Sequence, residues 1–165
     1  MSERKDDAPT PLANLVRAGD LQTEAIKVND FIFQVNDSSN LYLVNTADGD
    51  VLINTGFMDN AERNKKLLTP VRKGPLHKII LTQAHADHFG GVPAFKEADA
   101  KVVAEVRFKD TWNFFDELGP FLGRRSGKLW ASTMKRAGAP PPPPHVVADI
   151  EVDREYAFEQ GGRKF

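Results

Sequence analysis

The feature that most constrains this chain is a cluster of polar side chains directly after an apolar stretch. Residues 79–81 read as a buried β-strand, and a Gly-Gly pair follows at 90–91. Between them lie the four polar residues Gln83, His85, Asp87 and His88. Side chains at a strand end are held rigidly, and imidazole and carboxylate groups bind zinc, manganese or iron. The sequence therefore predicts a metal-binding loop over 82–91. The alternative is a polar surface turn that binds nothing.

The residues around this loop predict a mixed sheet. Residues 32–35, 41–44 and 51–53 are β-rich and are separated by polar turns, which predicts an antiparallel meander. From residue 51 to 104 strands and helices then alternate, with strands at 51–53, 77–81 and 102–104 and helices at 60–72 and 93–98. Such alternation is typical of parallel strands in a layered α/β fold.

Composition divides the chain into four predicted parts. These are a charged tail and short helix at 1–24, with the helix at 11–18; a layered core at 25–104; a helical aromatic insert with a polyproline spacer at 105–145; and strands at 146–165. In the last part we expect strands at 146–152 and 156–158. A third strand is expected at Lys164-Phe165, after the Gly161-Gly162 turn.

The insert is rich in aromatic and basic residues. Trp112 and Phe115, with Phe114, Phe121 and Trp130, are candidates to line an apolar substrate pocket. Arg124 and Arg125 are candidates to attract an anionic group of the substrate. The alternative is that the aromatic side chains pack the insert onto the core and the basic ones are solvated.

Composition argues against several other classes of protein. The net charge of -1 lacks the basic excess that nucleic-acid binding needs, so no nucleic-acid partner is expected. No apolar run approaches the ~20 residues of a membrane span, and the charged N-terminus lacks the apolar stretch of a secretory signal. We therefore expect no membrane and a cytoplasmic location. Cys is absent, so any metal ligands are nitrogen or oxygen atoms.

The predicted loop resembles that of the metallo-β-lactamase superfamily, which reads His-x-His-x-Asp-His and is usually followed by x-Gly-Gly. Residues 83–91 match this pattern except at the first His. Residues 52–56 resemble the family's preceding strand and turn, and residues 39–44 resemble its early hairpin. The sequence Ala-His-Ala-Asp-His-Phe-Gly-Gly-Val is most similar to alkylsulfatase-like members.

The resemblance implies an αββα sandwich of the α/β class, of which residues 25–104 would form the N-terminal half. It implies one or two zinc ions, with manganese or iron as alternatives. His85 would bind the first ion, and Asp87 and His88 the second. A metal-bound hydroxide, oriented by Asp87, would attack a small-molecule ester, lactone or sulfate ester.

Two positions depart from the family pattern. Gln83 replaces the first His, and a neutral amide oxygen is a poorer zinc ligand than imidazole. Asn54 replaces an Asp that, with the adjacent Thr55, would support the ligands, so a charge and a strong acceptor are lost. Because both changes lie beside the same site, we expect them to be coupled.

The ligands that the family supplies from its second half have no counterpart before Phe165. His145 follows five prolines outside any matching motif, and His77 lies at the start of its strand, far from the loop. We therefore expect the chain to be the N-terminal half alone, as a fragment of a longer protein or as a half completed by another chain. An open apolar sheet face would favour homo-oligomers.

Two functional hypotheses follow. The first is a metal-dependent hydrolase in which His85, Asp87 and His88 bind the metal. The second is a catalytically impaired module that binds or self-assembles. Metal analysis combined with the oligomeric state distinguishes them, because the second hypothesis predicts a metal-free oligomer.

Overall fold

The computed structural model describes residues 11–133 and 142–165. The helices are α1 (Pro11–Val16), α2 (Ala61–Leu68), α3 (Ala86–Phe89), α4 (Val92–Phe95), α5 (Phe108–Glu117) and α6 (Gly119–Thr133), with 3-10 turns η1 (Met58–Asn60) and η2 (Thr69–Val71). The strands are β1 (Ile26–Lys27), β2 (Ile32–Val35), β3 (Leu41–Thr46), β4 (Gly49–Ile53), β5 (Leu76–Ile80), β6 (Lys101–Glu105), β7 (Ile150–Val152), β8 (Glu159–Gln160) and β9 (Arg163–Lys164). Within those ranges no helix is long and apolar enough to cross a membrane. The tail at 1–10 and part of the polyproline spacer lie outside the described residues.

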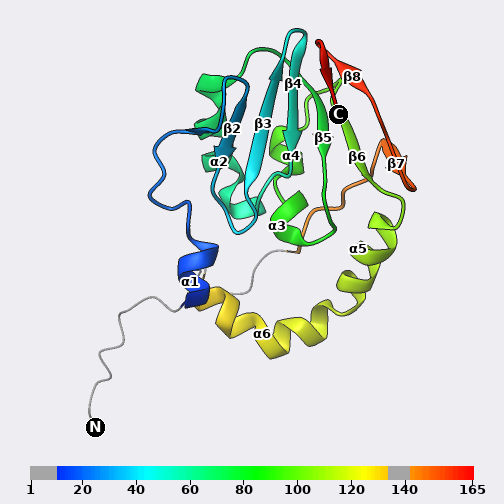
Figure 1. Cartoon of the computed structure of the whole chain (residues 1–165). Coiled ribbons are helices and arrows are strands. Elements are labelled where there is room, and N and C mark those ends of the chain that lie inside the picture. The colour runs from blue at the N-terminus through cyan, green and yellow to red at the C-terminus, as the bar shows by residue number, and fades with distance from the viewer. Residues whose placement is uncertain (1–10, 134–141) are drawn as a thin grey trace.

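Seven strands form one sheet whose spatial order is the order of the chain, β1 to β7 (Figure 1). Strands β1 to β4 pair antiparallel, whereas β4, β5, β6 and β7 pair parallel. Tight polar turns can join only antiparallel neighbours, and the parallel strands are joined by segments that contain helices. The predicted meander and the predicted parallel pairing are both confirmed.

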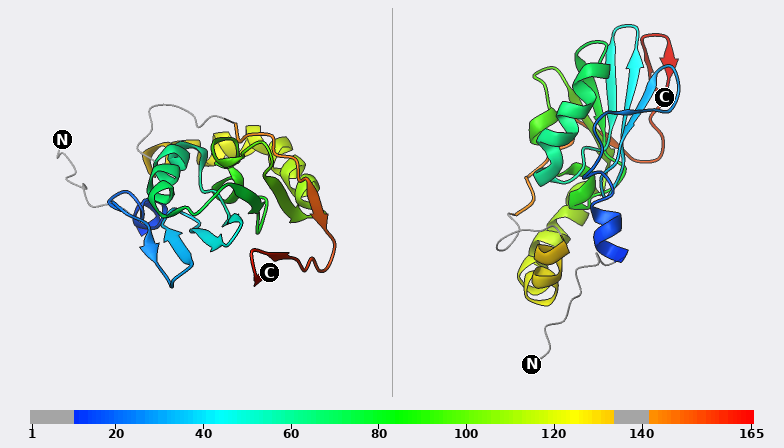
Figure 2. Two further views of the ribbon diagram at one scale, coloured as in Figure 1. Left: turned by 90° about the horizontal axis from the view of Figure 1, so that it is seen from above. Right: turned by 90° about the vertical axis from the view of Figure 1, so that its left-hand side faces the viewer.

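The main core lies between the sheet and the helices that cover one face, as seen from above in Figure 2. Pairing register aligns Leu43, Leu52, Ile79 and Val102 in one row across four strands. Each of these side chains is at most 1% exposed. They form one apolar cluster with side chains of α2, α3 and α4. Because Ile79 of β5 is packed in this row, the end of β5 is held in place, and the polar loop begins there.

The C-terminal hairpin β8–β9 lies over the opposite face of the sheet (Figure 2). Lys78 of β5 places its Nζ 4.5 Å from the centre of the Phe158 ring, and Arg163 of β9 donates to the carbonyl of Asn45 at 2.8 Å. Ile53 and Ile80 on this face are half-buried. The face that we expected to be open is therefore partly covered, and self-association through it stays a prediction.

Two of the predicted C-terminal strands were wrong in extent or position. β7 begins only at Ile150, which pairs with Val103 of β6, and Val146 packs in the core instead of extending the strand. Residues 156–158 precede the hairpin rather than form a strand. The turn determines this register, since Gly161 and Gly162 both have positive φ, and two-residue turns of that kind pair the residues immediately beside them.

Candidate active site

The polar loop that follows β5 brings three of its predicted residues into contact. The Oε1 atom of Gln83 is hydrogen-bonded to Nδ1 of His85, and its Nε2 atom lies 2.7 Å from Nε2 of His88. Asp87 lies beside them, with its Oδ2 atom 3.8 Å from Nε2 of His88. One carboxamide therefore connects the two histidines.

Asn54, at the end of β4, contacts this cluster through Thr82. The Nδ1 atom of His88 lies 3.0 Å from the Thr82 hydroxyl. Thr82 donates from its hydroxyl and from its backbone N–H to Oδ1 of Asn54, at 3.0 and 3.1 Å. Asn54 has a φ of 58°, in the left-handed region that asparagine tolerates better than most residues. The loop histidines and β4 are thus joined by one chain of hydrogen bonds.

The loop backbone is held by the segment after β4 and by the turn between β2 and β3. Thr55 donates to the carbonyl of His88 from its backbone N–H at 2.7 Å and from its hydroxyl at 3.0 Å. The Ser39 hydroxyl donates to the carbonyl of the preceding residue, Asp87. Two successive carbonyls of α3 are therefore fixed by residues that lie far away in the sequence.

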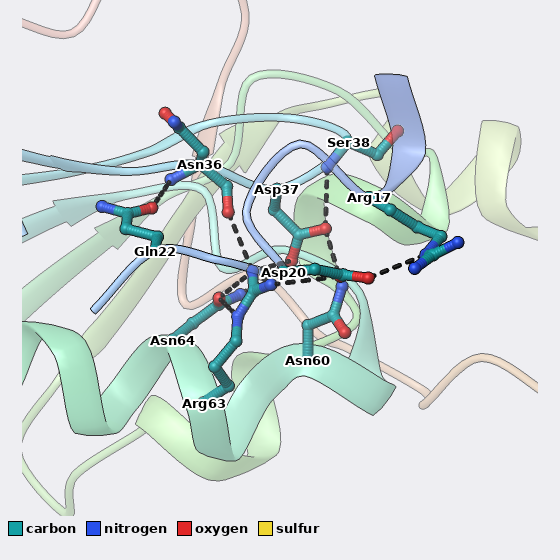
Figure 3. Close-up of polar contacts among 9 residues, drawn as sticks. All are labelled: Arg17, Asp20, Gln22, Asn36, Asp37, Ser38, Asn60, Arg63 and Asn64. Atoms are coloured by element: carbon teal, nitrogen blue, oxygen red, sulfur yellow. Dashed lines mark hydrogen bonds and ion pairs between the residues drawn. The ribbon is translucent and has the colours of Figure 1, made fainter. Parts of the chain in front are cut away.

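A buried carboxylate, Asp37, supports the turn that carries Ser39 (Figure 3). Asp37 is 3% exposed and accepts hydrogen bonds from the Asn60 amide at 2.9 Å, the Asn64 amide at 2.7 Å and the Ser38 backbone at 2.7 Å. Arg63 closes the cluster by donating to the carbonyl of the residue before Asp37 at 2.8 Å. The turn that contacts the loop is thus fixed onto α2.

A pocket of about 580 Å³ opens beside the loop. On one side it is bounded by the polar loop residues, including Gln83, His85, Asp87 and His88. The remaining wall is largely apolar and includes Phe57, Met58, Trp112, Phe115, Leu122 and Trp130. The Phe115 ring lies 4.8 Å from the His85 ring, centre to centre. The aromatic part of the pocket lining is therefore in direct contact with the polar loop.

The structure places only some of the insert's candidate substrate-binding residues at the pocket. Trp112 and Phe115 of α5 line the pocket, whereas Arg124 and Arg125 of α6 are exposed and lie outside its lining. His145 packs on Trp112, with ring centres 4.9 Å apart, and is not among the lining residues. His77 contacts the carbonyl of Asp48 at the opposite end of β5. The substrate role of the two arginines stays a prediction without a contact to support it.

Burial lowers the pKa of His88 below its ordinary value; the charge of Asp87 opposes this shift and that of His85 adds to it. We expect Asp87→Asn to lower the pKa of His88 further, because this replacement removes the charge that favours the protonated ring. NMR titration of the His88 ring measures the change. Asp99→Asn, which removes an exposed charge outside the site, is the control. A pKa that stays constant or rises in Asp87→Asn would contradict the expectation.

The donor atoms in the loop do not by themselves fit a zinc centre. Across residues 11–133 and 142–165, no three His, Asp, Glu or Cys side chains are grouped so that they could hold a metal ion. Even catalytic zinc sites take three ligands from the protein. Here the facing nitrogens of His85 and His88 are hydrogen-bonded to Gln83 instead.

Three residues whose hydrogen bonds support the polar loop were missed in the sequence. Thr82 lies inside the predicted loop. Its position between the strand and the motif could have indicated that its side chain contacts the site. Ser39 and Asp37 lie more than 40 residues upstream of the loop. Nothing local in the sequence shows that their turn would meet the loop, because that contact depends on how β3, β4 and β5 align.

The chain was compared with known families and curated proteins. Residues 35–165 match the model of a family described as the metallo-beta-lactamase superfamily. An alkyl/aryl-sulfatase of Saccharomyces cerevisiae is 33% identical over 95 residues, which cover 52% of this chain and 15% of the yeast protein. The chain thus corresponds to a small part of this relative's length.

Solved structures with the same fold extend the comparison. A stereoselective inverting sec-alkylsulfatase from Pseudomonas sp. superposes with a TM-score of 0.69 at 17% identity, over 96% of this chain and 30% of that one. A class B3 di-zinc metallo-beta-lactamase from an Alaskan soil metagenome gives a TM-score of 0.57 at 17% identity, over 86% of this chain and 50% of that one. At these identities the likeness concerns the fold alone.

Proposed function

The chain belongs to the metallo-beta-lactamase superfamily, and on that premise we propose that it forms the loop side of the active site of a hydrolase for sulfate esters of apolar alcohols. The observation that carries the proposal is that the polar loop and an aromatic wall face the same pocket. A sulfate ester of an apolar alcohol has the matching chemistry, with a compact polar head and an apolar tail. A relative at 33% identity is an alkyl/aryl-sulfatase, which supports this class over β-lactams.

The pocket suggests how such a substrate would be oriented. The sulfate head would lie against Gln83 and His85, where the polar atoms of the loop are concentrated. The tail would lie against Phe57, Trp112 and Trp130, and burial of apolar surface there would supply much of the binding free energy. Substrates with longer apolar tails are therefore expected to bind more tightly than methyl sulfate.

Zinc is the cofactor that this proposal carries over from the family, since a solved structure with the same fold is a di-zinc enzyme. His85, Asp87 and His88 are the residues of this chain that would contribute ligands. Because the described residues do not converge on an ion, the proposal requires further ligands to join them.

The direct test is release of sulfate from octyl sulfate by the purified chain, with zinc added, alongside calorimetric binding of the same compound. Sulfate release above the buffer rate, together with saturable binding, supports the proposal. Absence of binding would overturn it, because the pocket would then not recognise this class of substrate.

Trp112→Ala is expected to weaken binding of octyl sulfate about tenfold. The replacement removes a large apolar surface from the pocket wall. Tenfold in affinity corresponds to about 1.4 kcal/mol, close to the lower end of the range of about 1.5–3 kcal/mol for fully burying one apolar side chain. Phe114→Ala is the matched control, because Phe114 neighbours the wall but is 56% exposed and outside the lining. Equal loss in both variants would show that the effect does not come from the pocket.

The second candidate function is a binding module without hydrolysis. It is favoured by the Gln83 bridge and by the absence of any group of three metal-binding side chains in the described part of the chain. Saturable binding of octyl sulfate with no sulfate release, both with and without zinc, would select this alternative.

A further inference from the structure

We infer that Gln83 competes with a metal ion for the loop histidines and is not itself a ligand. The carboxamide lies between the two rings, with Oε1 on Nδ1 of His85 and Nε2 on Nε2 of His88. It thus takes hydrogen-bonding positions that a metal bound between the rings would need. The family resemblance alone left Gln83 as a weak ligand, and the two roles predict opposite effects of removing it.

The direction of each hydrogen bond can be worked out from one fixed donor. The backbone N–H of Thr82 can only donate, so the atom of Asn54 that faces it is the acceptor Oδ1. The Thr82 hydroxyl also lies 3.0 Å from this Oδ1 and must donate to it. Having used its only hydrogen, the hydroxyl accepts from His88, which places the proton of the His88 ring on Nδ1.

The same logic continues through the glutamine. A neutral His88 with its proton on Nδ1 has a lone pair on Nε2, which accepts from the Nε2 amide group of Gln83. The Gln83 oxygen is then left to accept from Nδ1 of His85. Each of these hydrogen bonds from Asn54 to His85 then joins one donor to one acceptor.

This arrangement has a direct consequence for metal binding. An ion would bind to His88 through the lone pair on its Nε2 atom. In this structure that lone pair accepts a hydrogen bond from the Gln83 amide. An ion that binds there must break this hydrogen bond. The Gln83 carboxamide is neutral, so it adds no electrostatic attraction to the ion that would offset the lost hydrogen bond. Asn54 acts in the same direction from the other side of His88, because an amide supports a cationic centre less than a carboxylate would. The two departures from the family pattern are thus linked through His88.

The test is calorimetric titration of the chain with zinc chloride. If Gln83 competes, Gln83→Ala removes the competitor and should bind zinc about fivefold more tightly than wild type, the equivalent of one net hydrogen bond. If Gln83 is a ligand, the same replacement weakens binding. Gln83 is exposed, so the alanine variant is expected to fold, and a thermal melt verifies this.

Three further variants complete the design. Gln83→His should bind more tightly than Gln83→Ala, because it removes the competitor and adds an imidazole ligand. His88→Ala should abolish the gain, which places binding at this loop. Asn54→Asp combined with Gln83→His should exceed the sum of the single effects, since both act on one histidine.

A zinc affinity of Gln83→Ala equal to or lower than that of wild type overturns the inference. NMR gives a second readout that needs no metal, because the ring nitrogens of both histidines should show a proton on Nδ1 in the wild type. These measurements contain no substrate. They can therefore succeed even if sulfate ester hydrolysis is not found, and they can fail even if it is.

Discussion

Replacing Phe89 by alanine is expected to lower the free energy of unfolding by about 3–5 kcal/mol. Phe89 is 1% exposed, and its ring packs edge-on against Phe108 with centres 5.5 Å apart. The cavity would open between α3 and α5, directly behind His88. Urea denaturation followed by circular dichroism measures the loss.

The Phe89 replacement has two useful comparisons. Phe89→Leu keeps most of the apolar volume and should lose less than half as much stability. Phe114→Ala removes the same side chain from a site that is 56% exposed and should change stability by less than about 1 kcal/mol. A small effect of Phe89→Ala would mean that the loop is not supported by this packing.

Asp37→Ala is expected to lower the free energy of unfolding by about 3 kcal/mol, the second largest effect after that of Phe89→Ala. The replacement leaves the amides of Asn60 and Asn64 and the N–H of Ser38 without their acceptor in a buried place, and unsatisfied buried donors cost about 1–3 kcal/mol each. It should also loosen the turn that holds the Asp87 carbonyl through Ser39. Chemical denaturation gives the stability, and amide exchange at residues 85–89 reports on the loop.

The pH dependence of stability separates the charge of Asp37 from its hydrogen bonds. Burial raises the pKa of Asp37 above its ordinary value, although its amide and backbone hydrogen bonds and the charge of Arg63 oppose the shift. The folded chain then holds this proton more tightly than the unfolded chain. The contribution of Asp37 to the stability of the fold is therefore greatest at pH values below the ordinary pKa of an aspartate. It falls as the pH rises through the raised pKa of Asp37 in the folded chain.

Asp37→Asn is the variant that isolates this effect. It keeps the shape of the side chain but cannot ionise, so the stability of wild type relative to Asp37→Asn should decrease as pH rises through that window. Carboxyls such as Glu97, whose pKa is lowered chiefly by Arg72, act in the opposite direction but are common to both proteins. A difference that stays constant with pH would contradict the raised pKa.

The sheet was predictable from the sequence because its signals are local. Strand 32–35 was predicted with the bounds it has, and 41–44, 51–53, 77–81 and 102–104 were predicted within two residues. Each is an apolar stretch bounded by a turn or by a change to helical spacing. β1 was missed because two exposed residues carry no pattern, and α3 was missed because four residues make only one helical turn.

The polar part of the site was most predictable where its residues are adjacent in sequence. Gln83, His85 and His88 were found because one loop carries all three. What the motif could not reveal is their hydrogen-bonding state, because the Gln83 bridge depends on side-chain orientation that the spacing leaves open. The aromatic wall was half-predicted, since Trp112, Phe115 and Trp130 were found. Phe57 and Met58 were missed because they lie at the start of η1, whose approach to the loop follows from the sheet.

The order of the sheet has a consequence for synthesis of the chain. Because β1 to β7 are neighbours in the order in which they are made, each strand that leaves the ribosome can add to the free edge of those already paired. Among the strands of the described residues, none has to insert between two others. The antiparallel strands β1 to β4 need only short loop closures, which favour fast folding, whereas each of the parallel strands β5 to β7 follows a longer crossover. The row of buried side chains can therefore grow stepwise, fast at first and then more slowly, while translation continues.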